Sequence, residues 1–73
     1  MTASKLQQLI IRIVGRRDGI EPGFLINQAV REGYSAQEVR EGIDWLLNTG
    51  QLDFHIERYG IEYCLPEGGV AHG

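Results

Sequence analysis

Apolar residues recur along the chain with two periods, and these predict three helices followed by a β-hairpin. Residues 4–14 carry apolar side chains at helical spacing, and residues 22–32 and 35–49 repeat that spacing. Glycines at positions 15, 33 and 50 follow the three segments, as expected where helices end. From residue 52 onward apolar and polar positions alternate, which indicates half-buried strands. The inward faces of the first and third helices are expected to consist of Leu6, Leu9, Ile10 and Ile13, and of Val39, Ile43, Leu46 and Leu47.

Two serines predict where the first and third helices begin. Ser4 and Gln7 have the spacing of a capping box, and Ser35 and Glu38 repeat it. In such a box each side chain satisfies a backbone N–H that the first helical turn leaves unpaired. Pro22 predicts the start of the second helix, because the N–H that proline lacks would be unpaired there in any case.

The apolar residues of the second helix and the position of Gly42 predict how the helices pack against one another. The second helix is expected to bury Leu25 or Ile26 together with Ala29 and Val30. Gly42 lies beside the inward face of the third helix, where glycine costs about 1 kcal/mol relative to alanine. We therefore expect another helix to cross the third one closely at Gly42.

The alternation in the last segment also predicts the register of the hairpin. If residues 57–60 form the loop, three apolar cross-strand pairs lie on one face, namely Leu52–Leu65, Phe54–Tyr63 and Ile56–Ile61. A shift by one residue would break every pair, so the register is strongly specified. Isolated hairpins are only marginally stable, and we expect this apolar face to pack on the helices. Ile20, the one apolar residue of the loop 15–23, is expected to pair with the hairpin.

The order helix, helix, helix, strand, strand resembles the winged helix-turn-helix family, which has an α+β fold. The segments 35–40, 43–47, 50–52 and 59–63 carry the resemblance, together with Leu65. The second helix, a short turn and the third helix would form the helix-turn-helix. We expect one domain over residues 1–66, followed by a flexible C-terminal tail at residues 67–73.

In that family the third helix usually enters the major groove of DNA, and the hairpin, or wing, contacts the backbone or the minor groove. The resemblance implies a small DNA-binding transcriptional regulator whose partner is double-stranded DNA. A homodimer is one expected form, because a single copy offers few contacts. Carried over by position, the contacts would come from Ser35, Gln37, Arg40, Glu41 and Asp44 in the third helix, from Arg58 and Tyr59 at the wing tip, and from Arg16 and Arg17 at a flanking phosphate.

The charge distribution favours a different partner. The net charge of −3 divides into +3 for residues 1–31 and −6 for residues 32–73. Residues 35–49 carry three acids against Arg40 alone, whereas neutralised phosphates supply most of the affinity for DNA. The alternative is a winged-helix protein-interaction module that does not bind DNA, with contacts from Trp45, Glu41 and Ile11. Trp45 could equally cover the edge of the core, and Ile11 could be a partly covered surface residue.

Nothing in the sequence indicates an enzyme or a bound cofactor. The histidines are His55 and His72, and the sequence has no phosphate-binding glycine loop and no nucleophile–base pair. Asp53, His55 and Cys64 share the outer face of the predicted hairpin. Zinc binding is one interpretation of that trio, and an ordinary polar sheet face is the favoured one.

The single cysteine and the apolar stretch of the first helix indicate the cellular location that we expect for the protein. Cys64 is the single cysteine, which excludes an intrachain disulfide and fits a reducing, cytoplasmic location. No membrane span is expected, because the apolar stretch 9–14 is short and Arg12 interrupts it.

Overall fold

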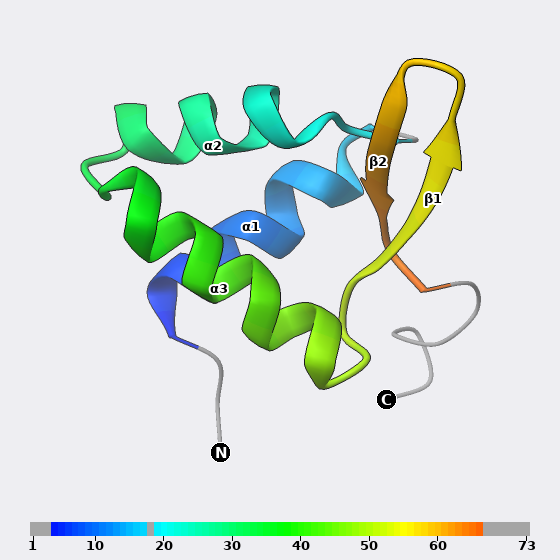
Figure 1. Ribbon diagram of the computed structural model, residues 1–73. Coiled ribbons are helices and arrows are strands. Elements are labelled where there is room, and N and C mark those ends of the chain that lie inside the picture. The colour runs from blue at the N-terminus through cyan, green and yellow to red at the C-terminus, as the bar shows by residue number, and fades with distance from the viewer. Residues whose placement is uncertain (1–3, 18, 67–73) are drawn as a thin grey trace.

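Three helices lead into a two-stranded antiparallel hairpin, an α+β layout consistent with a winged helix (Figure 1). The computed structural model describes residues 4–17 and 19–66, so the predicted tail at 67–73 lies outside the described residues. The elements, in chain order, are α1 (Lys5–Gly15), α2 (Pro22–Arg31), α3 (Ala36–Asn48), β1 (Asp53–Glu57) and β2 (Gly60–Cys64). Within the described residues, no helix is both long and apolar enough to cross a membrane.

Both predicted capping boxes are formed. At the start of α1 the Gln7 backbone N–H donates to Ser4 Oγ at 3.1 Å, and the Ser4 N–H donates to Gln7 Oε1 at 2.9 Å. At the start of α3 the Glu38 and Ser35 groups repeat these bonds at 3.1 and 2.9 Å. The boundaries of α1 and α3 are therefore set locally, by side chains within one turn of each helix start.

The core collects side chains from every helix, from the α1–α2 loop and from the base of the hairpin. Leu46 of α3 is fully buried, as predicted. The prediction for Val30 was wrong, because this residue is 43% exposed while Leu25 and Ala29 are fully buried. Leu25 and Ala29 lie one turn apart on one side of α2, and Val30 is turned roughly 140° away from Leu25. The core residues are Ile10, Val14, Ile20, Leu25, Ala29, Val39, Ile43, Leu46 and Leu52.

Gly42 is where α1 and α3 cross closely, which confirms the prediction. A Cβ atom at this position would lie 3.1 Å from Ile10 Cδ1 and 3.6 Å from Leu6 Cδ2. The missing side chain therefore lets the two helices approach each other, and the contact compensates for the low helix propensity of glycine.

The hairpin has the predicted register and is attached to the body by backbone pairing. Phe54 pairs with Tyr63, and Ile56 pairs with Ile61. On the other side of β2, Ile20 and Tyr63 exchange two backbone hydrogen bonds of 3.0 and 2.8 Å. The predicted pairing of Ile20 with the hairpin is thus confirmed.

The expectation that the whole apolar face of the hairpin packs on the helices was wrong. Leu52 at the base is buried, but Phe54, Ile56 and Ile61 are 47%, 76% and 39% exposed. Each strand rises about 3.3 Å per residue, so five residues carry the hairpin tip beyond the three helices (Figure 1). The core stabilises the base of the hairpin and leaves an apolar surface on its distal half.

Replacement of Leu46 by alanine should lower the free energy of unfolding by about 2–5 kcal/mol, because it opens a cavity in a fully packed core. Chemical denaturation measures this loss. The matched control is Leu47→Ala on the same helix, where the half-buried side chain should give a smaller loss. Equal effects of the two substitutions would contradict the described core.

Replacement of Ser35 by alanine should lower the free energy of unfolding by about 1 kcal/mol, because the Glu38 N–H loses its acceptor. Thermal unfolding monitored by circular dichroism measures the change. Ser35→Asp keeps an acceptor at the same place and should restore most of the stability. A Ser35→Asp variant as unstable as Ser35→Ala would show that the cap contributes nothing.

Candidate functional site

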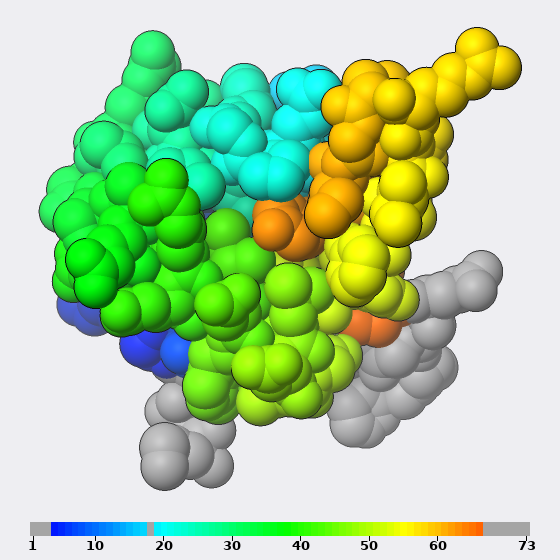
Figure 2. All heavy atoms as spheres, in the orientation of Figure 1, coloured from blue at the N-terminus to red at the C-terminus, as the bar shows by residue number. Residues whose placement is uncertain are grey.

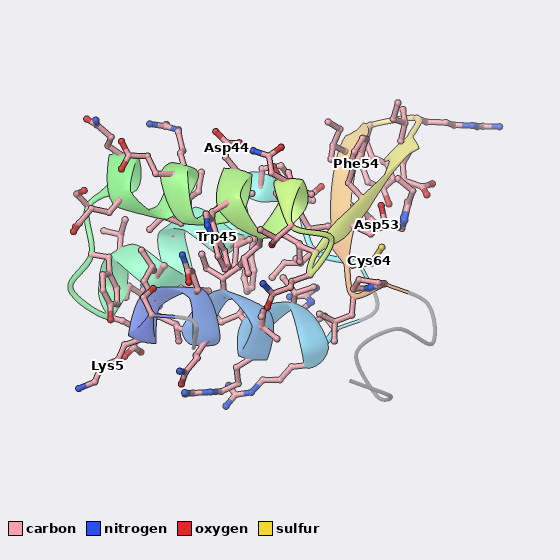
Figure 3. The ribbon with its side chains drawn as sticks, turned by 90° about the horizontal axis from the view of Figure 1, so that it is seen from below. Lys5, Asp44, Trp45, Asp53, Phe54 and Cys64 are labelled. Carbon is pink, nitrogen blue, oxygen red and sulfur yellow. The ribbon has the colours of Figure 1, made fainter. Side chains whose placement is uncertain are left out.

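The exposed surface of α3 and the apolar face of the hairpin form one candidate site, which we call the α3–wing face. From α3 it includes the exposed side chains of Gln37, Arg40, Glu41 and Asp44, and from the hairpin it includes Phe54, Ile56 and Ile61. Figure 2 shows this face, with α3 in green and the hairpin in yellow and orange. In Figure 3, Asp44 and Phe54 lie on the same side of the domain, and Lys5 of α1 lies on the opposite side.

Asp44 brings negative charge close to the hairpin. Tyr63 packs against the core. Burial raises its pKa, and the charge of Asp44 raises it further. Phe54 pairs with Tyr63 and therefore shares its side of the sheet. The α3–wing face thus combines a carboxylate of α3 with apolar side chains of the hairpin.

The α3 residues predicted to contact DNA are exposed, but two of them are hydrogen-bonded to each other. The Gln37 side-chain amide donates to Glu41 Oε2 at 3.2 Å. Ser35 Oγ is occupied as the helix cap. Arg40 is the only basic residue of α3, which carries three acidic residues. The carboxylates of Glu41 and Asp44 therefore dominate the charge of this helix surface.

The other residues predicted to contact DNA lie around the hairpin and do not form a continuous basic surface with Arg40. The Tyr59 hydroxyl donates to the Glu62 carboxylate, and Arg58 is exposed at the wing tip. The Arg17 guanidinium lies 4.8 Å from the centre of the Phe24 ring and lines a hollow with Glu62. Arg16 lines a second hollow with Cys64 and Leu65. Arg16 and Arg17 thus lie against the polar face of the hairpin, opposite the α3–wing face.

The two other residues predicted for a protein contact differ in exposure. Trp45 is 41% exposed and borders a shallow hollow together with Leu6, Glu38 and Glu41. Figure 3 places its ring between α3 and α1, so one part covers the core edge and another part stays accessible. Ile11 is half-buried and packs against the core, as expected of a partly covered surface residue.

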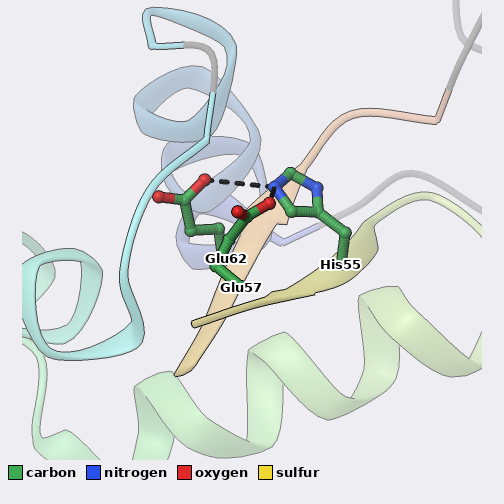
Figure 4. A group of neighbouring side chains, drawn as sticks. All are labelled: His55, Glu57 and Glu62. Carbon is green, nitrogen blue, oxygen red and sulfur yellow. Dashed lines mark hydrogen bonds and ion pairs between the residues drawn. The ribbon is translucent and has the colours of Figure 1, made fainter. Parts of the chain in front are cut away.

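The polar face of the hairpin holds a second group, His55, Glu57 and Glu62, which we call the His55 cluster (Figure 4). His55 Nε2 lies 3.0 Å from Glu57 Oε2 and 3.1 Å from Glu62 Oε1. Cys64 Sγ lies 3.8 Å from the other ring nitrogen, His55 Nδ1. Among the described residues, the chelating atoms of the three cluster members lie within 4.8 Å of one another.

This cluster differs from the predicted trio of Asp53, His55 and Cys64. Asp53 Oδ1 accepts a hydrogen bond from the Phe54 backbone N–H at 2.7 Å and is not part of the cluster. The sequence predicts Glu57 in the loop, but it is the last residue of β1 and shares a side with His55 two residues earlier. The signal that could have found it is a His-x-Glu pattern on one strand with a glutamate opposite the histidine.

The Glu62 carboxylate is held in place from two sides. Tyr59 donates its hydroxyl hydrogen to one oxygen, and His55 lies against the other. Gly19 has a φ of +97°, and a Cβ there would overlap Glu62 Oε1, so the α1–α2 loop can approach the carboxylate this closely only with glycine at position 19. The Tyr59 hydrogen bond lowers the pKa of Glu62, with His55 and Arg17 adding to the shift, and the same bond raises the pKa of Tyr59 to about 12.

The pKa of Glu62 should lie below its ordinary value of 4.5 and should rise in Tyr59→Phe, where the hydrogen bond is lost. A carbon-13 NMR titration of the side-chain carboxyl measures both. Because the folded state favours the charged form, this stabilisation is present above the unfolded pKa and is lost as pH falls through the lowered folded pKa. Tyr34→Phe, far along the chain from the hairpin, is the control and should leave the Glu62 titration unchanged. Identical titrations in the unmodified and Tyr59→Phe domains would rule out the Tyr59 contact.

No family model, curated protein or solved structure that was searched matches this chain.

Proposed function

We propose that the domain is a protein-interaction module whose α3–wing face binds a protein segment that carries apolar and basic side chains. The observation that carries the proposal is that an acidic α3 and exposed apolar residues of the hairpin lie on one side of the domain (Figure 3). A partner with apolar side chains would cover Phe54, Ile56 and Ile61, and basic side chains would meet Glu41 and Asp44.

The charge of α3 is the argument against DNA as the main partner. DNA affinity comes largely from contacts with phosphates, which scale with the number of Lys and Arg side chains that reach them. On this face Arg40 would have to supply that attraction against Glu41 and Asp44, and Gln37 would have to give up its bond to Glu41 before it could read a base. A DNA-binding regulator remains the second candidate, because Gln37 and Arg40 are chemically able to read adenine and guanine.

The apolar side chains give the proposed interface its anchors. Aromatic residues are enriched among the side chains that dominate binding energy, and Phe54 of the α3–wing face is 47% exposed. The hairpin residue Ile56 is 76% exposed, more than any other large apolar side chain among the described residues. An apolar surface of this kind marks an interaction site when polar residues surround it. The proposal places the module in the cytoplasm, where the single thiol of Cys64 stays reduced.

The test uses a synthetic peptide in which leucine and lysine alternate, titrated into the unmodified domain at low ionic strength. NMR shifts of Asp44, Phe54 and Ile56 should follow a single binding curve. Reversal of charge in a Glu41→Lys, Asp44→Lys variant should weaken binding roughly tenfold, because each exposed ion pair contributes about 0.2–1 kcal/mol and becomes repulsive. Asp53→Lys, on the polar face of the hairpin, is the matched control and should change the affinity little.

Three further titrations separate the alternatives. A peptide with glutamate in place of lysine should not bind. Mixed-sequence duplex DNA should bind the unmodified domain no more tightly than it binds the Asp53→Lys control. This titration is done at low salt, where phosphate contacts contribute most to the affinity of any protein that binds a DNA groove. Tight binding of DNA together with no binding of the lysine peptide would overturn the proposal in favour of the regulator. Shifts of the same residues on increasing protein concentration alone would identify a second copy of the chain as the occupant.

A further inference from the structure

The His55 cluster has more acceptor groups than its single ring nitrogen can satisfy. Two carboxylate oxygens, from Glu57 and Glu62, converge on Nε2 at 3.0 and 3.1 Å. A ring nitrogen carries at most one hydrogen, so it cannot donate a well-directed hydrogen bond to both oxygens at once. A dication at the same place would instead be bound by all three groups, with two negative charges offsetting its own.

We propose that His55, Glu57 and Glu62 form a zinc site on the polar face of the wing. One imidazole nitrogen and two carboxylate oxygens make a ligand set that suits Zn²⁺, and water would complete the coordination at this exposed surface. Ligands about 2.0–2.2 Å from a tetrahedral zinc ion stand roughly 3.4 Å apart. Nε2 is within a few tenths of an ångström of that spacing from each oxygen. The two oxygens lie within 4.8 Å of each other, and the exposed Glu57 side chain can move to bring them closer.

The scaffold around the cluster favours metal binding over a chance meeting of surface charges. The side chain of Glu62 is only 17% exposed, and Tyr59 and the close approach of Gly19 hold its carboxylate toward His55. Cys64 Sγ at 3.8 Å from Nδ1 orients the ring from its other nitrogen, which is how the second shell of a metal site fixes its histidines. All three ligands lie on two paired strands, so their spacing follows from the sheet register.

A zinc ion here would cross-link the part of the hairpin that the helices do not cover. It would join the end of β1 to the middle of β2, beyond the last core contact of the hairpin, and would make the wing more rigid. This role does not depend on the proposed protein partner, because the cluster and the α3–wing face lie on opposite sides of the sheet.

The test is a calorimetric titration of the full, metal-free chain with zinc chloride near neutral pH, repeated for single variants. The unmodified domain should form a one-to-one complex. His55→Ala, Glu57→Gln and Glu62→Gln should each weaken binding by at least about 100-fold, because the loss of an outer-shell partner alone costs 10- to 100-fold. Asp53→Asn, on the same face, and His72→Ala, which removes the other imidazole, should bind as well as the unmodified domain. Circular dichroism of each variant confirms that it is folded.

Cobalt provides a second readout that does not depend on affinity. The Co²⁺ complex of the unmodified domain should show visible d–d bands without the near-ultraviolet charge-transfer band of a thiolate ligand. A charge-transfer band that disappears in Cys64→Ser would overturn the proposal, because Cys64 would then be a direct ligand. No binding of zinc by the folded domain, or unchanged affinity in Glu57→Gln and Glu62→Gln, would overturn it as well.

Discussion

The backbone pairing between Ile20 and Tyr63 is the constraint on which both candidate sites depend. Two hydrogen bonds join the α1–α2 loop to the middle of β2, and the buried Ile20 side chain anchors the loop in the core. This pairing sets the direction in which the hairpin leaves the helices. It also brings Gly19 against Glu62, so the His55 cluster and the α3–wing face are both positioned by one short stretch of backbone.

The strict alternation of strand side chains divides the wing into two chemically different surfaces. One surface carries Phe54 and Ile56 and faces α3, and the other carries His55 and Glu57 and faces the loop after α1. A hairpin packed on the helices along its full length would have lost the first surface to the core. Because the strands extend past the helices, five residues in each are enough to present an apolar contact surface and a polar cluster back to back.

Local chemistry made much of the fold predictable from the sequence. The capping boxes at Ser4 and Ser35 involve groups three residues apart, and the hairpin register follows from alternation alone. The exposure of Val30 and of the distal hairpin was missed, because it depends on how far the helices extend over their neighbours in space. The place of Glu57 in the His55 cluster was missed because β1 is one residue longer than predicted. Glu57 is therefore a strand residue on the same side as His55 and not a loop residue.

The uneven burial of the hairpin has a consequence for its motions. The base is linked to the core through Leu52 and the Ile20–Tyr63 pair, so its amide hydrogens can exchange with solvent only when much of the domain unfolds. The distal rungs, Ile56–Ile61 and Glu57–Gly60, have no such support and can separate while the rest stays folded. We therefore expect the tip of the wing to open more readily than its base, and a ligand on either of its faces would make that opening rarer.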